Sequence, residues 1–270
     1  MLKTACGLVL RETAVGESDK LLTVLTPEYG KLLLSAKGVR SMRSKNIPLC
    51  RLFTYGNFEF YEKNGHCWLS GGSVIDSFYE LNSDIEGFAL AAYVTDVATE
   101  LSGEGENGED ILRLSLNTLY AITKKLRPYN QIKGAFELYA ASHAGFMPDI
   151  SGCRECNKRA ASYFYLDVMN GNMLCSECLG KQQKGYYRET DSGVITVDRY
   201  EQRSIILPMS PAVTAAVNYA VSAPVRRLFS FELKEKEDIK DFSKVGETYL
   251  SNHLERGFET LSFYHSVSED

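Results

Sequence analysis

The sequence predicts an α+β protein in which a small β-barrel precedes a helical region that carries a four-cysteine element. Three observations support this fold class. Five strand-like segments, separated by turns rich in glycine, fall within residues 1–80. Apolar residues then recur at helical spacing over residues 81–150. Two Cys-x2-Cys pairs follow within residues 151–190, and further helical segments occupy residues 191–270.

The predicted strands favour a closed barrel of the OB or SH3 kind. Short strands with glycine-rich turns close into barrels because closure leaves no unpaired edge. The turns include Gly16–Lys20 and Pro27–Gly30. The strands are expected at residues 5–13, 20–26, 31–36, 55–61 and 66–76.

A basic segment, residues 37–45, lies between the third and fourth predicted strands. It contains four cations and no acid: Lys37, Arg40, Arg43 and Lys45. Two interpretations stay open, a solvated loop or a loop at the barrel mouth that neutralises phosphates. Nearby rings could stack bases, although their strand spacing is more typical of a core. These rings are Phe53, Tyr55, Phe58 and Phe60.

Composition indicates an ordinary protein of 270 residues, 44% hydrophobic and 24% charged, long enough for one to three domains. It contains no apolar run suited to a signal segment or a membrane span, so a cytoplasmic location is expected. The net charge of −5 argues against nucleic-acid binding. Residues 1–50, however, hold eight Lys and Arg against four Asp and Glu, which keeps binding by the first domain possible.

Five helices are predicted from apolar periodicity, and Asp84 is placed to cap the first of them. Pro128 should stop the second, whose last turn would contain Lys124, Lys125 and Arg127. A short strand is expected at residues 194–197, and the tail, residues 255–270, should dock through Phe258, Leu261, Phe263 and Tyr264. The helices are expected at residues 84–102, 109–127, 131–145, 211–222 and 239–254.

The cysteine pairs, Cys153 with Cys156 and Cys175 with Cys178, are separated by eighteen residues, a spacing typical of structural zinc. Four thiolates fill a tetrahedral zinc site and leave no open position for a substrate. The alternative is that they are ordinary buried or disulfide-bonded cysteines. A strand at residues 162–168 should lie between the pairs. The other three cysteines show no motif and should behave as small core residues in a reduced compartment; they are Cys6, Cys50 and Cys67.

No catalytic motif stands out in the sequence. A phosphate-binding loop of the Gly-Lys-Ser/Thr type is absent, so an autonomous ATPase is not expected. The four histidines lie far apart without ligand spacing, and no nucleophile-base signature is evident. We therefore expect a binding protein rather than an enzyme.

Four motifs resemble the bacterial recombination protein family RecO. In order along the chain, they are Gly7–Arg11, Gly16–Lys20, Thr26–Gly30 and Ala36–Arg40. The cysteine pairs, with Gly171–Cys175 at the second, resemble those of zinc-bearing members. The resemblance covers residues 1–80 well and residues 150–180 moderately.

The resemblance implies an N-terminal OB-fold, a helical body and a zinc element, without catalytic turnover. It implies binding of single- and double-stranded DNA, annealing of complementary strands, work with RecR, and help in loading RecA onto strands covered by single-strand-binding protein (SSB). The location implied is the cytoplasm, in association with the nucleoid. Contacts with DNA are expected from Lys20, Lys31, Lys37, Arg40, Arg43 and Lys45.

The resemblance also implies an encounter with the acidic C-terminal tail of SSB, which ends in apolar residues. A receptor for such a tail needs a hydrophobic notch beside cations. The best candidate cations are Lys124, Lys125, Arg127 and Lys133, with Leu126 and Phe136 as apolar walls. The alternative is that residues 124–127 only complement a helix C-terminus.

Two other functions remain open from the sequence. The chain could be a zinc-containing nucleic-acid enzyme or an accessory subunit of one, and magnesium-dependent cleavage of DNA would favour that class. It could instead be a protein-interaction scaffold without DNA contact. Partner binding with no DNA binding at any salt concentration would favour the scaffold.

Overall fold

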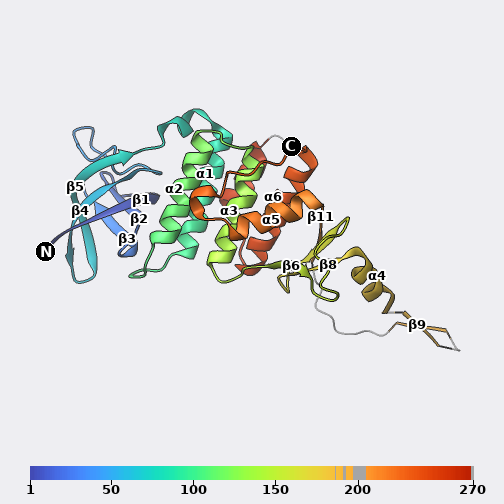
Figure 1. Ribbon diagram of the computed structural model, residues 1–270. Coiled ribbons are helices and arrows are strands. Elements are labelled where there is room, and N and C mark those ends of the chain that lie inside the picture. Colours follow the sequence, from blue (N-terminus) through green and yellow to red (C-terminus); the bar gives the residue numbers. More distant parts are fainter. Residues whose placement is uncertain (186, 191–192, 197–204, 269–270) are drawn as a thin grey trace. The chain divides into compact units, whose positions relative to one another are not determined.

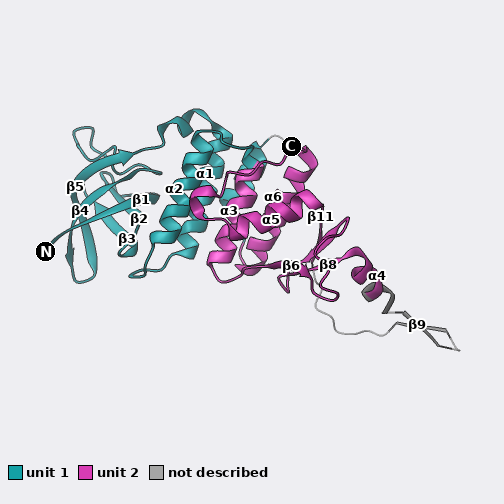
Figure 2. Cartoon of the chain, viewed as in Figure 1, with its two compact units in different colours: residues 1–129, 257–270 teal, residues 130–256 magenta. Residues whose placement is uncertain are grey.

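The fold is that of a computed structural model, which describes residues 1–185, 187–190, 193–196 and 205–268 (Figure 1). For those of them within residues 182–204 the description is limited to the backbone. The described chain divides into two compact units (Figure 2). Unit 1 contains residues 1–129 and 257–270, and unit 2 contains residues 130–256.

Unit 1 begins with a closed five-stranded barrel, as predicted. The strand order around it is β1-β2-β3-β5-β4, and the only parallel pairing within this barrel joins β3 to β5, where Ser35 lies opposite Trp68. The predicted strands are all present, extended by a few residues at their ends. Their bounds are β1 Leu2–Val15, β2 Asp19–Thr26, β3 Gly30–Ala36, β4 Tyr55–Lys63 and β5 His66–Asp76.

Alternate residues of the strands fill the barrel, because successive side chains of a strand point to opposite faces. Leu22, Leu34 and Phe58 are fully buried in this core. The segment between β3 and β4 contributes to it as well, through Val39 and Leu49. The basic loop is therefore fixed to the barrel by apolar side chains on both sides of Arg40, Arg43 and Lys45.

Three α-helices and one 3-10 helix complete the described part of unit 1. They are η1 Tyr79–Ser83, α1 Ile85–Leu101, α2 Glu109–Thr123 and α7 Glu259–Val267. Asp84 caps α1 as predicted, accepting a hydrogen bond from the Gly87 N–H. The β2–β3 turn docks on the α1–α2 loop: Gly30 has φ +58°, and a side chain there would collide with the Gly103 carbonyl.

Several details of unit 1 differ from the sequence expectation. Helix α2 ends at Thr123 rather than at residue 127, because Lys125 adopts a left-handed conformation with φ 48°. Ile85, which lies on the apolar stripe of the helix predicted at residues 84–102 and would therefore be inside, is 66% exposed at the first position of α1. The tail forms a helix, α7, that buries Phe258, Leu261 and Tyr264 while Phe263 stays exposed.

Unit 2 combines helices with a four-stranded sheet of order β11-β7-β8-β6 and a separate hairpin, β9–β10. The expected strand at residues 194–197 corresponds to β10, and Val197 lies outside the described residues. The expected helix at residues 239–254 is α6. The elements are α3 Tyr129–His143, β6 Asp149–Cys153, β7 Phe164–Asp167, β8 Asn172–Cys175, α4 Ser176–Gly185, β9 Tyr187–Thr190, β10 Gly193–Thr196, β11 Ile206–Met209, α5 Pro211–Ser222, η2 Val225–Arg227 and α6 Lys236–His253.

The predicted fold class is confirmed: a barrel of OB strand order is followed by a helical region with a four-cysteine cluster. None of the helices in the described ranges is both long enough and apolar enough to cross a membrane.

Candidate metal centre and nucleic-acid interface

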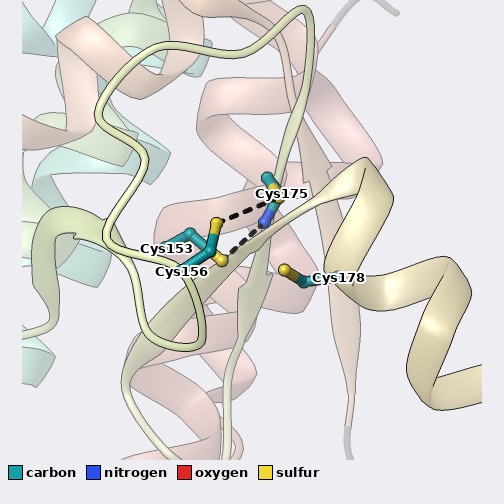
Figure 3. Close-up of side chains that lie close together, drawn as sticks. All are labelled: Cys153, Cys156, Cys175 and Cys178. Atoms are coloured by element: carbon teal, nitrogen blue, oxygen red, sulfur yellow. Dashed lines mark hydrogen bonds between the residues drawn. The ribbon is translucent and has the colours of Figure 1, made fainter.

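The four cysteines of the two pairs come together in unit 2, and their sulfurs all lie within 4.8 Å of one another. Cys153 ends β6 and Cys175 ends β8, while Cys178 lies in the first turn of α4. Figure 3 shows the four side chains directed toward a common centre. Among the described residues this is the only group of three or more His, Cys, Asp or Glu side chains placed to hold a metal ion.

The geometry of the cluster fits a tetrahedral metal ion. With metal–sulfur bonds of about 2.3 Å, a tetrahedron requires sulfurs about 3.8 Å apart. The Cys156 and Cys175 sulfurs are 3.8 Å apart. The Cys175 N–H also donates to the Cys153 sulfur at 3.3 Å, the kind of outer hydrogen bond that orients a metal ligand. Three of the ligands are buried and Cys156 is exposed.

The pKa values of Cys153 and Cys178 are shifted in opposite directions within the cluster. Burial opposes ionisation of Cys153, but backbone N–H groups of Cys175, Cys156 and Glu155 outweigh it and lower its pKa to about 6. Burial and hydrogen bonds to the neighbouring thiols raise the pKa of Cys178 to about 12. A metal ion bound between the sulfurs would favour the ionised form of all four thiols, because its positive charge offsets their mutual repulsion.

The basic loop, residues 37–45, leaves its predicted cations on the surface of unit 1. Lys37, Arg40, Arg43 and Lys45 are all exposed. The loop is held against the β1–β2 turn by hydrogen bonds from the Gly38 N–H to Asp19 at 2.7 Å and from the Arg40 guanidinium to the Gly16 carbonyl at 2.9 Å. The cations are thus presented from an anchored loop.

The two remaining lysines expected at DNA have partners within unit 1. Lys20 forms an ion pair with Glu12 at 2.6 Å and donates to the Cys50 carbonyl. Lys31 donates to the Thr99 carbonyl at 2.9 Å, which ties β3 to α1. Both cations take part in interactions that hold the unit together.

The aromatic residues are distributed in the way the core interpretation predicts. Phe53, Phe58 and Phe60 are at most 3% exposed, so they are unable to stack bases, and Tyr55 is half-buried. Three outward-facing aromatic side chains of the barrel were missed from the sequence as possible contacts for bases. They are Tyr61, His66 and Trp68, at the β4–β5 hairpin.

The cations expected to receive an acidic tail do not all reach a surface. Lys133 lies on α3 with its side chain fully buried in unit 2, paired with Glu137 at 3.2 Å and Glu247 at 2.6 Å. Phe136 is also buried. In unit 1, Lys124 pairs with Glu80 and Lys125 pairs with Asp84.

Beside these two lysines, Leu126 is 39% exposed. The Arg127 guanidinium donates to the Leu126 carbonyl. The surface that remains from the predicted set is therefore residues 124–127.

The fold and the cysteine cluster define a class: an OB-type barrel protein with a helical region and a four-cysteine cluster that could hold a metal ion. Two family models match the chain, one described as "Recombination protein O N terminal" over residues 1–78 and the other as "Recombination protein O C terminal" over residues 82–186. The chain belongs to the RecO family.

Three curated relatives, each named DNA repair protein RecO, illustrate the similarity. The protein of Acetivibrio thermocellus is 29% identical over 97% of this chain and 95% of its own length. That of Clostridium acetobutylicum is 26% identical over 98% of this chain and 97% of its own length. That of Shouchella clausii is 30% identical over 69% of this chain and 72% of its own length.

Proposed function

We propose that this protein is a recombination mediator in DNA repair that binds single- and double-stranded DNA and anneals complementary strands. With RecR, it helps to load RecA onto single strands covered by SSB, in the cytoplasm at the nucleoid. Membership of the RecO family, whose curated relatives are DNA repair proteins, carries this proposal. The mechanism needs no bond cleavage by the protein.

The anchored basic loop supports the DNA-binding part of the proposal. An isolated flexible cation gains little from one phosphate, because ordering its side chain costs entropy. Here the backbone on both sides is already fixed, by the buried Val39 before the tip and the buried Leu49 after it. The loop therefore presents Arg43 and Lys45 from an ordered backbone before DNA arrives, which suits capture of phosphates.

We propose zinc as the ion at the four cysteines and a structural role for it. An all-thiolate set selects zinc over the harder divalent ions. With four protein ligands no coordination position stays open for a substrate. The ion would join β6, β8 and α4, which are short elements, so that its binding energy would contribute to folding.

The encounter with SSB is assigned to residues 124–127. An acidic tail ending in apolar residues would place its carboxylates beside Lys124 and Arg127 and its apolar end on Leu126. Lys125 is the weakest member of this set, because its ammonium is already held by Asp84 at 2.8 Å and lies over the Tyr129 ring. The interaction would recruit the protein to covered strands without using the basic loop.

Annealing of complementary labelled oligonucleotides, bare or covered with SSB, tests the proposal across a salt series. We expect annealing faster than the spontaneous rate, with affinity that falls steeply as salt rises. Magnesium-dependent cleavage of the strands would indicate a nucleic-acid enzyme instead. Partner binding without DNA binding at any salt concentration would indicate a scaffold.

A further inference from the structure

Three aromatic side chains form a patch on the outer surface of the barrel. Trp68, the only tryptophan in the chain, lies on β5 opposite Tyr61 of β4. Residues paired across two strands share a face, and since Phe60, next to Tyr61, is buried in the core, Tyr61 and Trp68 point outward. The exposed His66 lies two residues before Trp68 on the same face, with ring centroids 6.0 Å apart.

The strand register places this aromatic patch beside the basic loop. The parallel pairing of β3 with β5 sets Trp68 opposite Ser35, and the basic loop begins two residues later at Lys37. With about 3.3 Å per residue along a strand and about 4.8 Å between strands, the Trp68 and Lys37 backbones lie roughly 8 Å apart. On the other side, the exposed Lys63 pairs with His66 at the tip of the hairpin.

Such an arrangement fits a ligand that carries both anionic groups and flat apolar faces. Single-stranded DNA offers both, since its bases are unpaired, whereas duplex DNA hides the base faces. The barrel does not need these rings for its own core, because Phe58 and Phe60 already fill it. Tyr61 remains 50% exposed, at a position where a polar residue would be accommodated equally well.

We propose that Trp68, with Tyr61 and His66 beside it, is the surface on which the barrel stacks unpaired bases. This inference rests on the proposed DNA-binding function and adds the residues that distinguish single strands from duplexes. The basic loop would hold phosphates of either form, and the aromatic patch would favour the unpaired one.

The single tryptophan makes a direct experiment possible. Trp68 emission, excited where tyrosine does not absorb, is followed while an oligothymidylate is added, and the anisotropy of a labelled oligonucleotide reports binding in the same mixture. We expect strong quenching by the single strand, because a base stacked on an indole quenches it. A duplex of equal length and an abasic strand should bind with little quenching.

Variants separate stacking from charge. Trp68→Ala should weaken single-strand binding by about tenfold, leave duplex binding within about twofold and keep the same dependence on salt, since no cation is removed. Trp68→Phe should restore most of the affinity. Tyr61→Ala provides a second test that keeps Trp68 as reporter, and Tyr79→Ala, which removes a ring 64% exposed outside the barrel, is the matched control.

The outcomes distinguish a failure of the stacking surface from a failure of the DNA-binding function. Normal binding by anisotropy with unchanged Trp68 emission, or equal single-strand affinity of Trp68→Ala and the wild type, would overturn the stacking surface and leave DNA binding intact. The patch would then be assigned to a protein partner. Absence of any anisotropy change would overturn the DNA-binding function and the stacking surface with it.

Discussion

Asp84 joins three segments of unit 1 through one carboxylate. It caps α1, accepts a hydrogen bond from the Tyr129 hydroxyl and pairs with Lys125 beyond the end of α2. Burial opposes its ionisation, but Lys125, Tyr129 and the Gly87 N–H outweigh burial and lower its pKa from 3.8 to about 2. The ionised form therefore stabilises the unit at neutral pH.

Replacing Asp84 by Ala should lower the free energy of unfolding by about 1–2 kcal/mol at neutral pH, the usual cost of a lost N-cap. Because the folded-state pKa is depressed, the part of this contribution that depends on the charge of Asp84 is complete above pH 3.8 and should disappear as the pH falls from 3.8 toward 2. Denaturant titrations at several pH values measure it. Asp84→Asn keeps the cap and removes the charge, so a cost equal to that of Ala would assign the effect to the Lys125 pair.

The burial of Lys133 could not be predicted from the sequence around it. A lysine near a helix start is usually exposed, and nothing in its neighbours in sequence indicates otherwise. Its burial depends on Glu247, more than a hundred residues away on α6, which lies 2.6 Å from the ammonium. A buried pair of this kind is visible only once the packing of α3 on α6 is known, whereas the exposed loop cations could be predicted from local sequence alone.

At the scale of the elements, the basic loop presents its four cations on the surface of unit 1. Changing Arg40, Arg43 and Lys45 together to Ala should weaken single-strand binding while the thermal midpoint stays within about a degree or two, because exposed charges contribute little to stability. The slope of log affinity against log salt should fall by roughly 0.7 for each phosphate that the loop no longer neutralises. Ala at Lys234, Lys236 and Lys240, exposed lysines of unit 2, is the matched control. An unchanged slope would mean that the loop is only solvated.

The metal element should behave as a separate folding element of unit 2. Cys175→Ser removes one thiolate ligand and keeps the backbone N–H that donates to Cys153, so the metal should be lost and hydrogen exchange should accelerate over residues 150–181. Metal analysis and exchange of the same sample measure both. Cys67→Ser, a cysteine of the barrel, should retain the metal.

The barrel should keep its exchange protection in Cys175→Ser, because its core is complete within unit 1. Loss of that protection would contradict the separation of the two units. Full metal occupancy in the variant would contradict the assignment of Cys175 as a ligand.

Elements with strong local signals could be predicted, and those set by distant pairing could not. The five barrel strands and the cap at Asp84 follow from alternation and capping chemistry. The cysteine cluster follows from the spacing of its pairs. In contrast, the C-terminal end of α2 depends on the left-handed Lys125, and the strand β11 depends on pairing with β7, about forty residues earlier. The tail helix α7 is only nine residues long, too short for periodicity to reveal it.

At the scale of the whole molecule, we expect binding of SSB and capture of DNA strands to use different surfaces, residues 124–127 and the basic loop. Arg127→Glu should weaken binding of an SSB tail peptide at least about tenfold, roughly 1.4 kcal/mol, because the reversed charge repels the acidic tail. Annealing of bare strands should be unchanged. Titration of a fluorescent tail peptide measures the affinity, and Arg113→Glu, a charge reversal on helix α2 of unit 1, is the control. Equal affinities for the wild type and Arg127→Glu would place the receptor elsewhere.

The return of the chain to unit 1 after residue 256 has a consequence for synthesis. During translation β1 emerges first and α7 follows the whole of unit 2. Until it emerges, α1 lacks the Phe258 ring that packs on Tyr93 and the Thr260 hydroxyl that binds Asp96. An apolar side of α1 in unit 1 therefore stays uncovered while the ribosome adds more than a hundred further residues. This interval is when the exposed side of α1 would be open to chaperones that bind emerging chains.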